Sequence, residues 1–149
     1  MTDPHRPAGV GGPAGISDAH RIKLDPDPGD RFNIAQGYRI GDLVIVSGQA
    51  AIDEEGQIVG VGDFDAQAEQ AFANLRRTLE AAGSSLEKVV KVTIYLTDMS
   101  NFPRIVDLRA RYFTSPWPAD TIVGVTALAL PDLQIEIEAM ALADGEVLG

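Results

Sequence analysis

The sequence predicts an α+β fold in which a single mixed β-sheet carries two helices on one face. KVVKVTIYLTD (residues 88–98) alternates apolar and polar residues, which is typical of a half-buried strand. Between residues 64 and 82, apolar residues recur every three or four positions, which predicts an amphipathic helix. The order of segments is two or three strands, a helix, a strand, a helix and two strands, with no internal repeat.

The N-terminal half supplies the first strands. Residues 1–17 are rich in Gly and Pro, and we expect a flexible tail there. A single domain is expected over residues 18–143, with a short C-terminal tail over residues 144–149. HRIKLD (residues 20–25) is the first expected strand, and AQGYRIGDLVIVSGQ (residues 35–49) follows as a hairpin.

The C-terminal half supplies the rest of the sheet. Gly83 stands where the first helix should end. A second helix is expected over residues 101–113, with Ser100 as its N-cap. Two strands, over residues 121–128 and 133–141, complete the fold.

Composition excludes several classes of protein. The chain has 149 residues, enough for one domain, and no cysteine, so disulfides, thiolate nucleophiles and Cys-ligated zinc are excluded. Its net charge of −10 disfavours nucleic acid and anionic membranes, which bind clustered Lys and Arg. No apolar run approaches the ~18 residues of a membrane span. The N-terminus lacks a signal-peptide pattern, and we expect a cytoplasmic protein.

Few residues are available for metal binding or nucleophilic catalysis. The two histidines are His5, in the expected tail, and His20, which disfavours a Ser-His-Asp arrangement and a metal site. GVGGPAG (residues 9–15) has no preceding strand and no following Lys-Ser/Thr, so it is not a phosphate-binding loop. Carboxylate, amide, hydroxyl and backbone groups remain.

Two segments concentrate such groups. In LQIEIEAMA (residues 133–141), Gln134, Glu136 and Glu138 share one strand face, with the two carboxylates ~7 Å apart. This face is either an exposed polar surface or the wall of a pocket, where desolvation raises the pKa of a carboxyl that handles a water's proton. Ser47-Gly48-Gln49 is either a tight turn or a source of backbone N–H groups for a ligand oxygen.

Several segments together resemble the Rid family (RidA/YjgF-like reactive intermediate deaminases, often labelled L-PSP endoribonuclease-like). They are DLVIVSGQ, DFDAQAEQAFANLRRTLEAAGSSLEKVVKVTIYLTDMSNF, YF, PWPADTIVGVTAL and IEIEAMA, and the resemblance spans about residues 21–143. It implies a chorismate mutase-like fold and a homotrimer, with the sheets forming a central barrel and small-molecule clefts between subunits. The deaminases of the family hydrolyse 2-imino acids to 2-keto acids and ammonia without a cofactor.

The resemblance also implies roles for individual residues. Ser47, Gly48 and Gln49 match a turn that contributes to the cleft, and Glu136 matches the glutamate thought to position the attacking water. Trp117 would wall the pocket. Asp120 stands where the deaminases have an arginine, in a Pro-Ala-Arg motif, that grips the substrate carboxylate.

The acid at position 120 changes the expected substrate. An Arg–carboxylate hydrogen-bonded pair contributes roughly 1.5–3 kcal/mol, and a like charge at ~4 Å costs on the order of 4 kcal/mol at an effective dielectric near 20. Ordinary 2-imino acid deamination is therefore disfavoured. Alternatives stay open for both residues. Arg109 either rebuilds carboxylate binding from the second helix or, as we favour, is an exposed helix arginine. Asp120 either faces the cleft or is structural, pairing with Arg39 or Arg111 or capping a turn.

Three functions follow from these observations. The first is a Rid-like, cofactor-independent hydrolase or deaminase that acts on an imine or enamine, with a specificity altered by Asp120. The alternative is a non-catalytic trimer that binds a metabolite or a protein. A ribonuclease ranks last, because the charge is acidic and no histidine pair is available.

Overall fold

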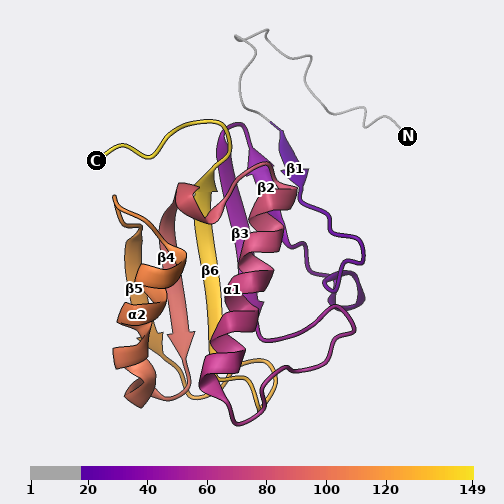
Figure 1. Cartoon of the computed structure of the whole chain (residues 1–149). Helices are drawn as coiled ribbons and strands as arrows, with labels where there is room; N and C mark the ends of the chain where they lie inside the picture. The colour runs from indigo at the N-terminus through magenta and orange to yellow at the C-terminus, as the bar shows by residue number, and fades with distance from the viewer. Residues whose placement is uncertain (1–17) are drawn as a thin grey trace, which may run out of the picture.

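The fold is one six-stranded mixed sheet with two helices packed on one face, which confirms the predicted class (Figure 1). It is seen in a computed structural model, which describes residues 18–149. The strands are β1 (Ala19–Arg21), β2 (Gly37–Ile40), β3 (Leu43–Ala50), β4 (Val89–Leu96), β5 (Ala119–Gly124) and β6 (Ile135–Leu142). The helices are α1 (Phe64–Ala81) and α2 (Phe102–Tyr112), with short 3-10 turns at Asp30–Phe32, Leu86–Lys88 and Met99–Asn101.

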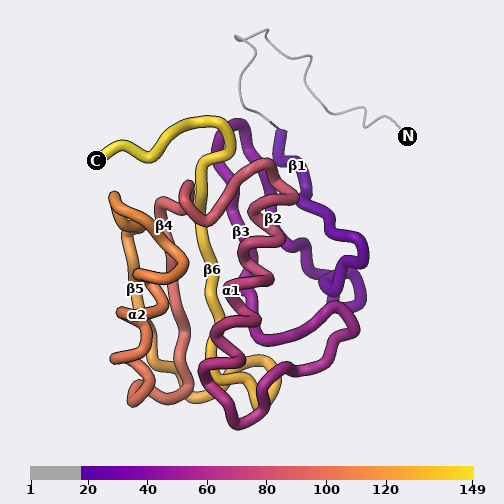
Figure 2. The backbone as a smooth tube through the Cα atoms, in the orientation of Figure 1, coloured from indigo at the N-terminus to yellow at the C-terminus, as the bar shows by residue number. Residues whose placement is uncertain are grey.

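The last strand lies in the middle of the sheet, whose order is β1-β2-β3-β6-β4-β5. All neighbours are antiparallel except β4 and β5, which are parallel because α2 connects them as a crossover. The tube in Figure 2 shows β6 running between β3 and β4, behind α1. As the alternation in residues 133–141 predicts, Ile135 and Ile137 are fully buried beneath the helices, and Glu136 and Glu138 point to the helix-free face.

The two helices are joined by aromatic packing. The ring of Phe72 on α1 stacks on that of Tyr112 at the end of α2, with centroids 4.2 Å apart, and meets Phe113 edge-on. The Asp63 side chain caps α1 by accepting the Ala66 N–H at 3.1 Å. Gly83 follows the helix with φ +79°, in the left-handed region that a C-terminal glycine favours, as predicted.

Three predicted boundaries are wrong. Ser100 is not the N-cap of α2: Asp98 accepts the Ser100 N–H at 2.9 Å and caps a 3-10 turn, and α2 begins at Phe102. The strand expected over residues 121–128 begins at Ala119 and ends at Gly124, because its partner β4 ends at Leu96, opposite Gly124. The first strand is only three residues long, since the chain turns away after Arg21.

The C-terminal segment is attached to the sheet for at least two residues beyond the expected domain boundary. The backbone N–H groups of Asp144 and Gly145 both donate to the Asp42 carboxylate, and Asp144 forms an ion pair with Arg39. The expected tail over residues 1–17, with His5, lies outside the described residues.

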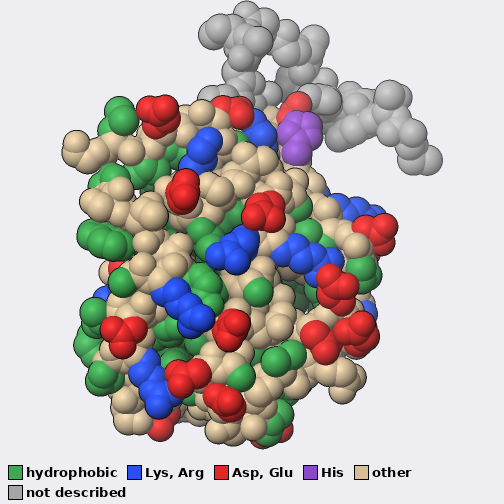
Figure 3. All heavy atoms as spheres, viewed as in Figure 1, with side chains coloured by type: hydrophobic (Ala, Val, Ile, Leu, Met, Phe, Trp, Pro, Cys, Tyr) green, Lys and Arg blue, Asp and Glu red, His purple; other side chains and the backbone are tan. Residues whose placement is uncertain are grey.

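The described surface shows no large patch of one charge on the face that carries α1. Figure 3 shows Lys and Arg side chains interspersed with Asp and Glu across that face. No helix within residues 18–149 is long and apolar enough to cross a membrane.

Candidate functional site

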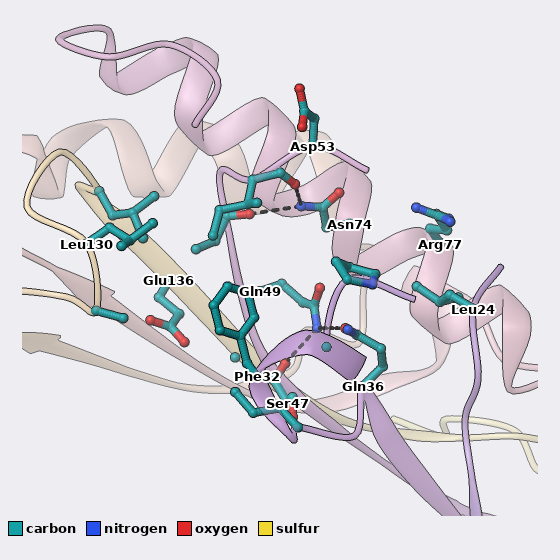
Figure 4. A pocket seen from close by; sticks show the side chains of 18 residues that line it. Leu24, Phe32, Gln36, Ser47, Gln49, Asp53, Asn74, Arg77, Leu130 and Glu136 are labelled. Atoms are coloured by element: carbon teal, nitrogen blue, oxygen red, sulfur yellow. Dashed lines mark hydrogen bonds between the residues drawn. The ribbon is translucent and has the colours of Figure 1, made fainter. Parts of the chain in front are cut away.

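A cavity of about 400 Å³ lies beside the C-terminal end of β3 and the start of β6 (Figure 4). The loop between β1 and β2 covers one side of it, and α1 and the segment after β3 form the other. Much of the wall is apolar, including Leu24, Phe32, Ile34, Leu130 and Leu133. The cavity therefore favours a ligand with an apolar body.

A β-bulge places the predicted Ser47–Gln49 turn in this wall. The register of β3 against β6 shifts between Val46 and Gln49, leaving Ser47 and Gly48 outside the regular pairing. A side chain at position 48 would force Glu136 to move, because a Cβ there would lie 2.0 Å from Oε1 of Glu136. Glycine at this position allows the Glu136 carboxyl to lie against the backbone of the bulge.

Glu136 has the environment of a proton-handling carboxyl. Burial raises its pKa above the ordinary value of 4.5, and the nearby charge of Glu138 raises it further. Within residues 18–149 its carboxyl accepts no hydrogen bond, although it lines the cavity. Glu138 is engaged differently, since the Tyr95 hydroxyl donates to its Oε1 at 2.5 Å. The two carboxylates of this strand thus differ in their roles.

Gln49 is held by a chain of buried polar side chains that the sequence did not reveal. Its Nε2 donates to Oε1 of Gln36 and to the Ser47 carbonyl, both at 3.1 Å. Gln36 in turn donates through Nε2 to Oδ1 of Asp27, also at 3.1 Å. The Asp27 side chain is only 1% exposed and also accepts the backbone N–H groups of Gly29 and Leu24.

Ser47 supports the wall and is less available to a ligand than predicted. Its backbone N–H donates to the Gln36 carbonyl at 2.8 Å, and its Oγ donates to the Ala35 carbonyl at 2.7 Å. The interpretation of the turn as a set of free backbone N–H donors is therefore wrong for Ser47, because the strand that follows the loop uses this group.

Asn74 and Arg77 of α1 also belong to the wall. Asn74 donates to the carbonyls of Ala50 and Ile52 at 2.9 and 2.8 Å, which ties the segment after β3 to the helix. Arg77 forms an ion pair with Glu54 at 2.8 Å. Both side chains use donors to hold the wall together.

Asp120 and Trp117 do not line this cavity. Asp120 lies near the start of the edge strand β5 and accepts two hydrogen bonds from Arg109 of α2, from Nε at 2.7 Å and Nη2 at 2.8 Å. The alternatives that paired Asp120 with Arg39 or Arg111 are wrong: Arg39 pairs with Asp144, and Arg111 lies over the Tyr112 ring. Trp117 is 59% exposed.

No group of three or more His, Asp or Glu side chains in the described part of the chain is arranged to hold a metal ion. One cavity is therefore lined by Ser47, Gly48, Gln49 and Glu136. Asp120 on the edge strand β5, and Trp117 just before that strand, lie away from it.

Comparisons with known proteins agree on one family. The sequence profile described as Endoribonuclease L-PSP matches residues 24–143. A RutC family protein of Pyrococcus horikoshii is 39% identical over 72% of this chain and 84% of its own. The 2-iminobutanoate/2-iminopropanoate deaminase of Dermatophagoides farinae is 33% identical over 81% of this chain and 92% of its own.

A solved structure agrees with these sequence relatives. RidA from an Antarctic Psychrobacter is 35% identical and superposes with a TM-score of 0.75, over 83% of this chain and 98% of that one.

Proposed function

Because the chain belongs to the Endoribonuclease L-PSP family, which includes RidA, we propose that it is a cofactor-independent hydrolase that releases ammonia from an imine or enamine metabolite in the cytoplasm. The observation that carries the proposal is Glu136, a half-buried carboxyl with a raised pKa, open to a largely apolar cavity. A carboxyl whose pKa lies above the ordinary value holds a proton more tightly than an exposed glutamate does, and imine hydrolysis requires a group that accepts and returns a proton.

The proposed reaction needs only water and Glu136. The Glu136 carboxylate accepts a proton as a water oxygen bonds to the carbon of a protonated imine, giving a carbinolamine. The same proton then returns to the nitrogen. As the C–N bond breaks, the Glu136 carboxylate accepts the hydroxyl proton, so a neutral carbonyl compound and ammonia form. The ammonia takes this proton and leaves as ammonium, which restores the carboxylate. The apolar wall excludes bulk water from the carbon, so one positioned water reacts.

The proposed substrate differs from the 2-imino acids of the deaminases. Asp120 occupies the position that the resemblance gives to a carboxylate-binding arginine, and the Arg109 edge that would bind a carboxylate is occupied by Asp120 itself. A substrate carboxylate would have to displace Asp120 to use this guanidinium. We therefore assign the chain to neutral or cationic imines and enamines.

A homotrimer with clefts between subunits would unite the two groups of site residues. Within one subunit, the cavity lies between β3 and β6, whereas Asp120 lies on the edge strand β5 and Trp117 lies just before it. A second copy whose β5 edge rests against the cavity would bring them into one cleft. The helix-free face of the sheet supports such packing, because it presents an apolar row of Tyr38, Ile45 and Met140, which are paired neighbours across three strands.

The second candidate is a trimer that binds a metabolite without reacting with it. The Arg109–Asp120 pair favours it, since the pair closes a position used for substrate in the deaminases.

A measurement of turnover separates the two functions. Imines with and without a carboxylate can be generated in situ by flavin amino-acid oxidases and amine oxidases, and ammonia release is then compared with the spontaneous rate.

If the protein is a hydrolase, we expect it to raise the rate of ammonia release above the spontaneous rate for imines that lack a carboxylate. We expect little effect on the rate for 2-imino acids. No acceleration with either class, together with a ligand-induced rise in Tm, would establish the binding protein instead.

A further inference from the structure

Several donor groups of the cavity wall bind the protein itself. Ser47, Asn74 and Arg77 donate to backbone carbonyls or to Glu54, and Gln36 donates to Asp27. The Glu136 carboxyl and Oε1 of Gln49 are neighbouring parts of the lining, and neither accepts a hydrogen bond from residues 18–149. Every fully buried side-chain N or O atom in that part of the chain has a partner, so these oxygens are accessible.

The orientation of the Gln49 amide follows from Asp27. An ionised carboxylate only accepts hydrogen bonds, so Gln36 must present its NH₂ to Asp27. The Gln36 oxygen then faces Gln49 and receives its NH₂, and the Ser47 carbonyl receives the second N–H. With both hydrogens used, the Gln49 oxygen points into the cavity, as Figure 4 shows.

Asp27 stays ionised because its hydrogen bonds outweigh its burial. Burial alone raises the pKa of this carboxyl, but the donors of Gln36, Gly29 and Leu24 bring it below the ordinary value. Arg21, 3.7 Å from Oδ2, adds a further attraction. The direction of this chain of hydrogen bonds is therefore fixed at neutral pH, where the Asp27 carboxyl is ionised.

We propose that the Asp27–Gln36 pair orients Gln49 so that its oxygen and the Glu136 carboxyl together bind a ligand nitrogen that bears N–H groups, which makes this cavity selective for protonated imines, amidines and primary amines. The inference deepens the proposed function, since it names the chemical group that the same cavity recognises. Asp27 and Gln36 are positioning residues, and they act through Gln49.

Three ligands of the same shape test whether the cavity prefers hydrogen-bond donors to acceptors: benzamidinium, which only donates, benzamide, which does both, and benzoate, which only accepts. Their ring suits the apolar wall, and only the polar group changes. Dissociation constants are measured at pH 7.5 on the full chain by calorimetry. We expect affinity to fall in the order benzamidinium, benzamide, benzoate, with at least a tenfold difference between the first and the last, because the cation is the only probe whose polar group solely donates.

Variants then locate the effect. Gln49→Met removes the oxygen at similar volume and should weaken benzamide and benzamidinium roughly fivefold, the value of about one net hydrogen bond, while benzoate is unaffected. Gln36→Met removes one of the two acceptors that hold the Gln49 amide nitrogen, so the Gln49 amide can turn over. The ratio of benzamide to benzoate affinity should therefore decrease. Gln57→Met is the control, since that side chain is exposed and lies outside the cavity.

The order of the probes on the unaltered protein tests the inference even if a variant fails to fold. Benzoate binding as tightly as benzamidinium, or no measurable benzamidinium binding at millimolar concentration, would overturn it. So would unchanged benzamide affinity in a folded Gln49→Met variant. Selective benzamidinium binding without turnover of any imine would overturn the proposed function alone, and turnover without this selectivity would overturn the inference alone.

Discussion

Glu136 and Gly48 are in contact across two neighbouring strands, so closely that a Cβ on residue 48 would lie 2.0 Å from the Glu136 carboxyl oxygen. The bulge in β3 creates this contact, and the carboxyl takes the space that a side chain would fill. The position of the proposed catalytic group therefore depends on the absence of a side chain at position 48.

Gly48→Ala should displace the Glu136 carboxyl without removing it. The blocking atoms are at the end of a flexible side chain, so Glu136 can turn away at little cost to stability, and we expect kcat to fall at least tenfold while Tm changes by a few degrees. Steady-state kinetics and thermal unfolding measure the two effects. Gly124→Ala is the matched control, because its Cβ would meet only the flexible Met99 side chain. Full activity in Gly48→Ala would show that the placement of Glu136 is unimportant.

The raised pKa of Glu136 predicts a pH-dependent stability. The folded state holds this proton more tightly than the unfolded chain does, so its contribution is fully present below about pH 4.5 and is lost as pH rises through the folded pKa. Glu136→Gln removes the ionisation, and its Tm should rise relative to wild type as pH increases from 4 to 7. Glu69→Gln, an exposed change on α1, should track wild type at every pH. If the Tm difference between Glu136→Gln and wild type stayed constant from pH 4 to 7, the raised pKa of Glu136 would be contradicted.

Asp120→Asn should release Arg109 and cost stability. The side chains are 30% and 15% exposed, so loss of the two-point pair should lower the free energy of unfolding by about 1–3 kcal/mol. The freed guanidinium should raise kcat/KM for 2-imino acids relative to neutral imines. Asp144→Asn, which breaks the more exposed Arg39 pair, should have a smaller effect on Tm and none on specificity. Unchanged specificity in Asp120→Asn would make the pair purely structural.

Ile45→Lys should prevent assembly. Ile45 lies in the middle of the apolar row between Tyr38 and Met140, and a buried lysine there has no partner. Light scattering coupled to size exclusion should report a trimer for wild type and a monomer for the variant. Val61→Lys, at a more exposed apolar residue in a loop outside the sheet, should remain a trimer. A wild-type monomer, or a trimeric Ile45→Lys, would contradict the proposed packing.

The strand and helix pattern could be predicted because each element is amphipathic. Alternation in β4 and β6 and the apolar repeat of α1 depend on local spacing, and the structure buries those same residues. The end of β5 could not be predicted, because this strand stops at Gly124, where its partner β4 stops at Leu96. The short β1 could not be predicted either, because the apolar and polar pattern of residues 20–25 continues beyond its last residue, Arg21.

The candidate site could be predicted only in part. Glu136 and the Ser47–Gln49 turn were identified by resemblance, but the Asp27–Gln36 connection joins a loop to a strand and has no periodic signal. The partner of Asp120 had a signal that the prediction missed. Arg109 is four residues after the buried Ile105, so both lie on the face of α2 that packs toward the sheet, where Asp120 is within reach. Arg111 does not lie on that face.

The most direct test of the central claim is the rate of ammonia release from a carboxylate-free imine generated in situ, compared between wild type, Glu136→Gln and the control Glu69→Gln. If Glu136 manages the proton of the attacking water, wild type and Glu69→Gln accelerate release equally, and Glu136→Gln loses roughly 10²–10⁴-fold in kcat. A folded Glu136→Gln variant that releases ammonia at the wild-type rate would contradict the account.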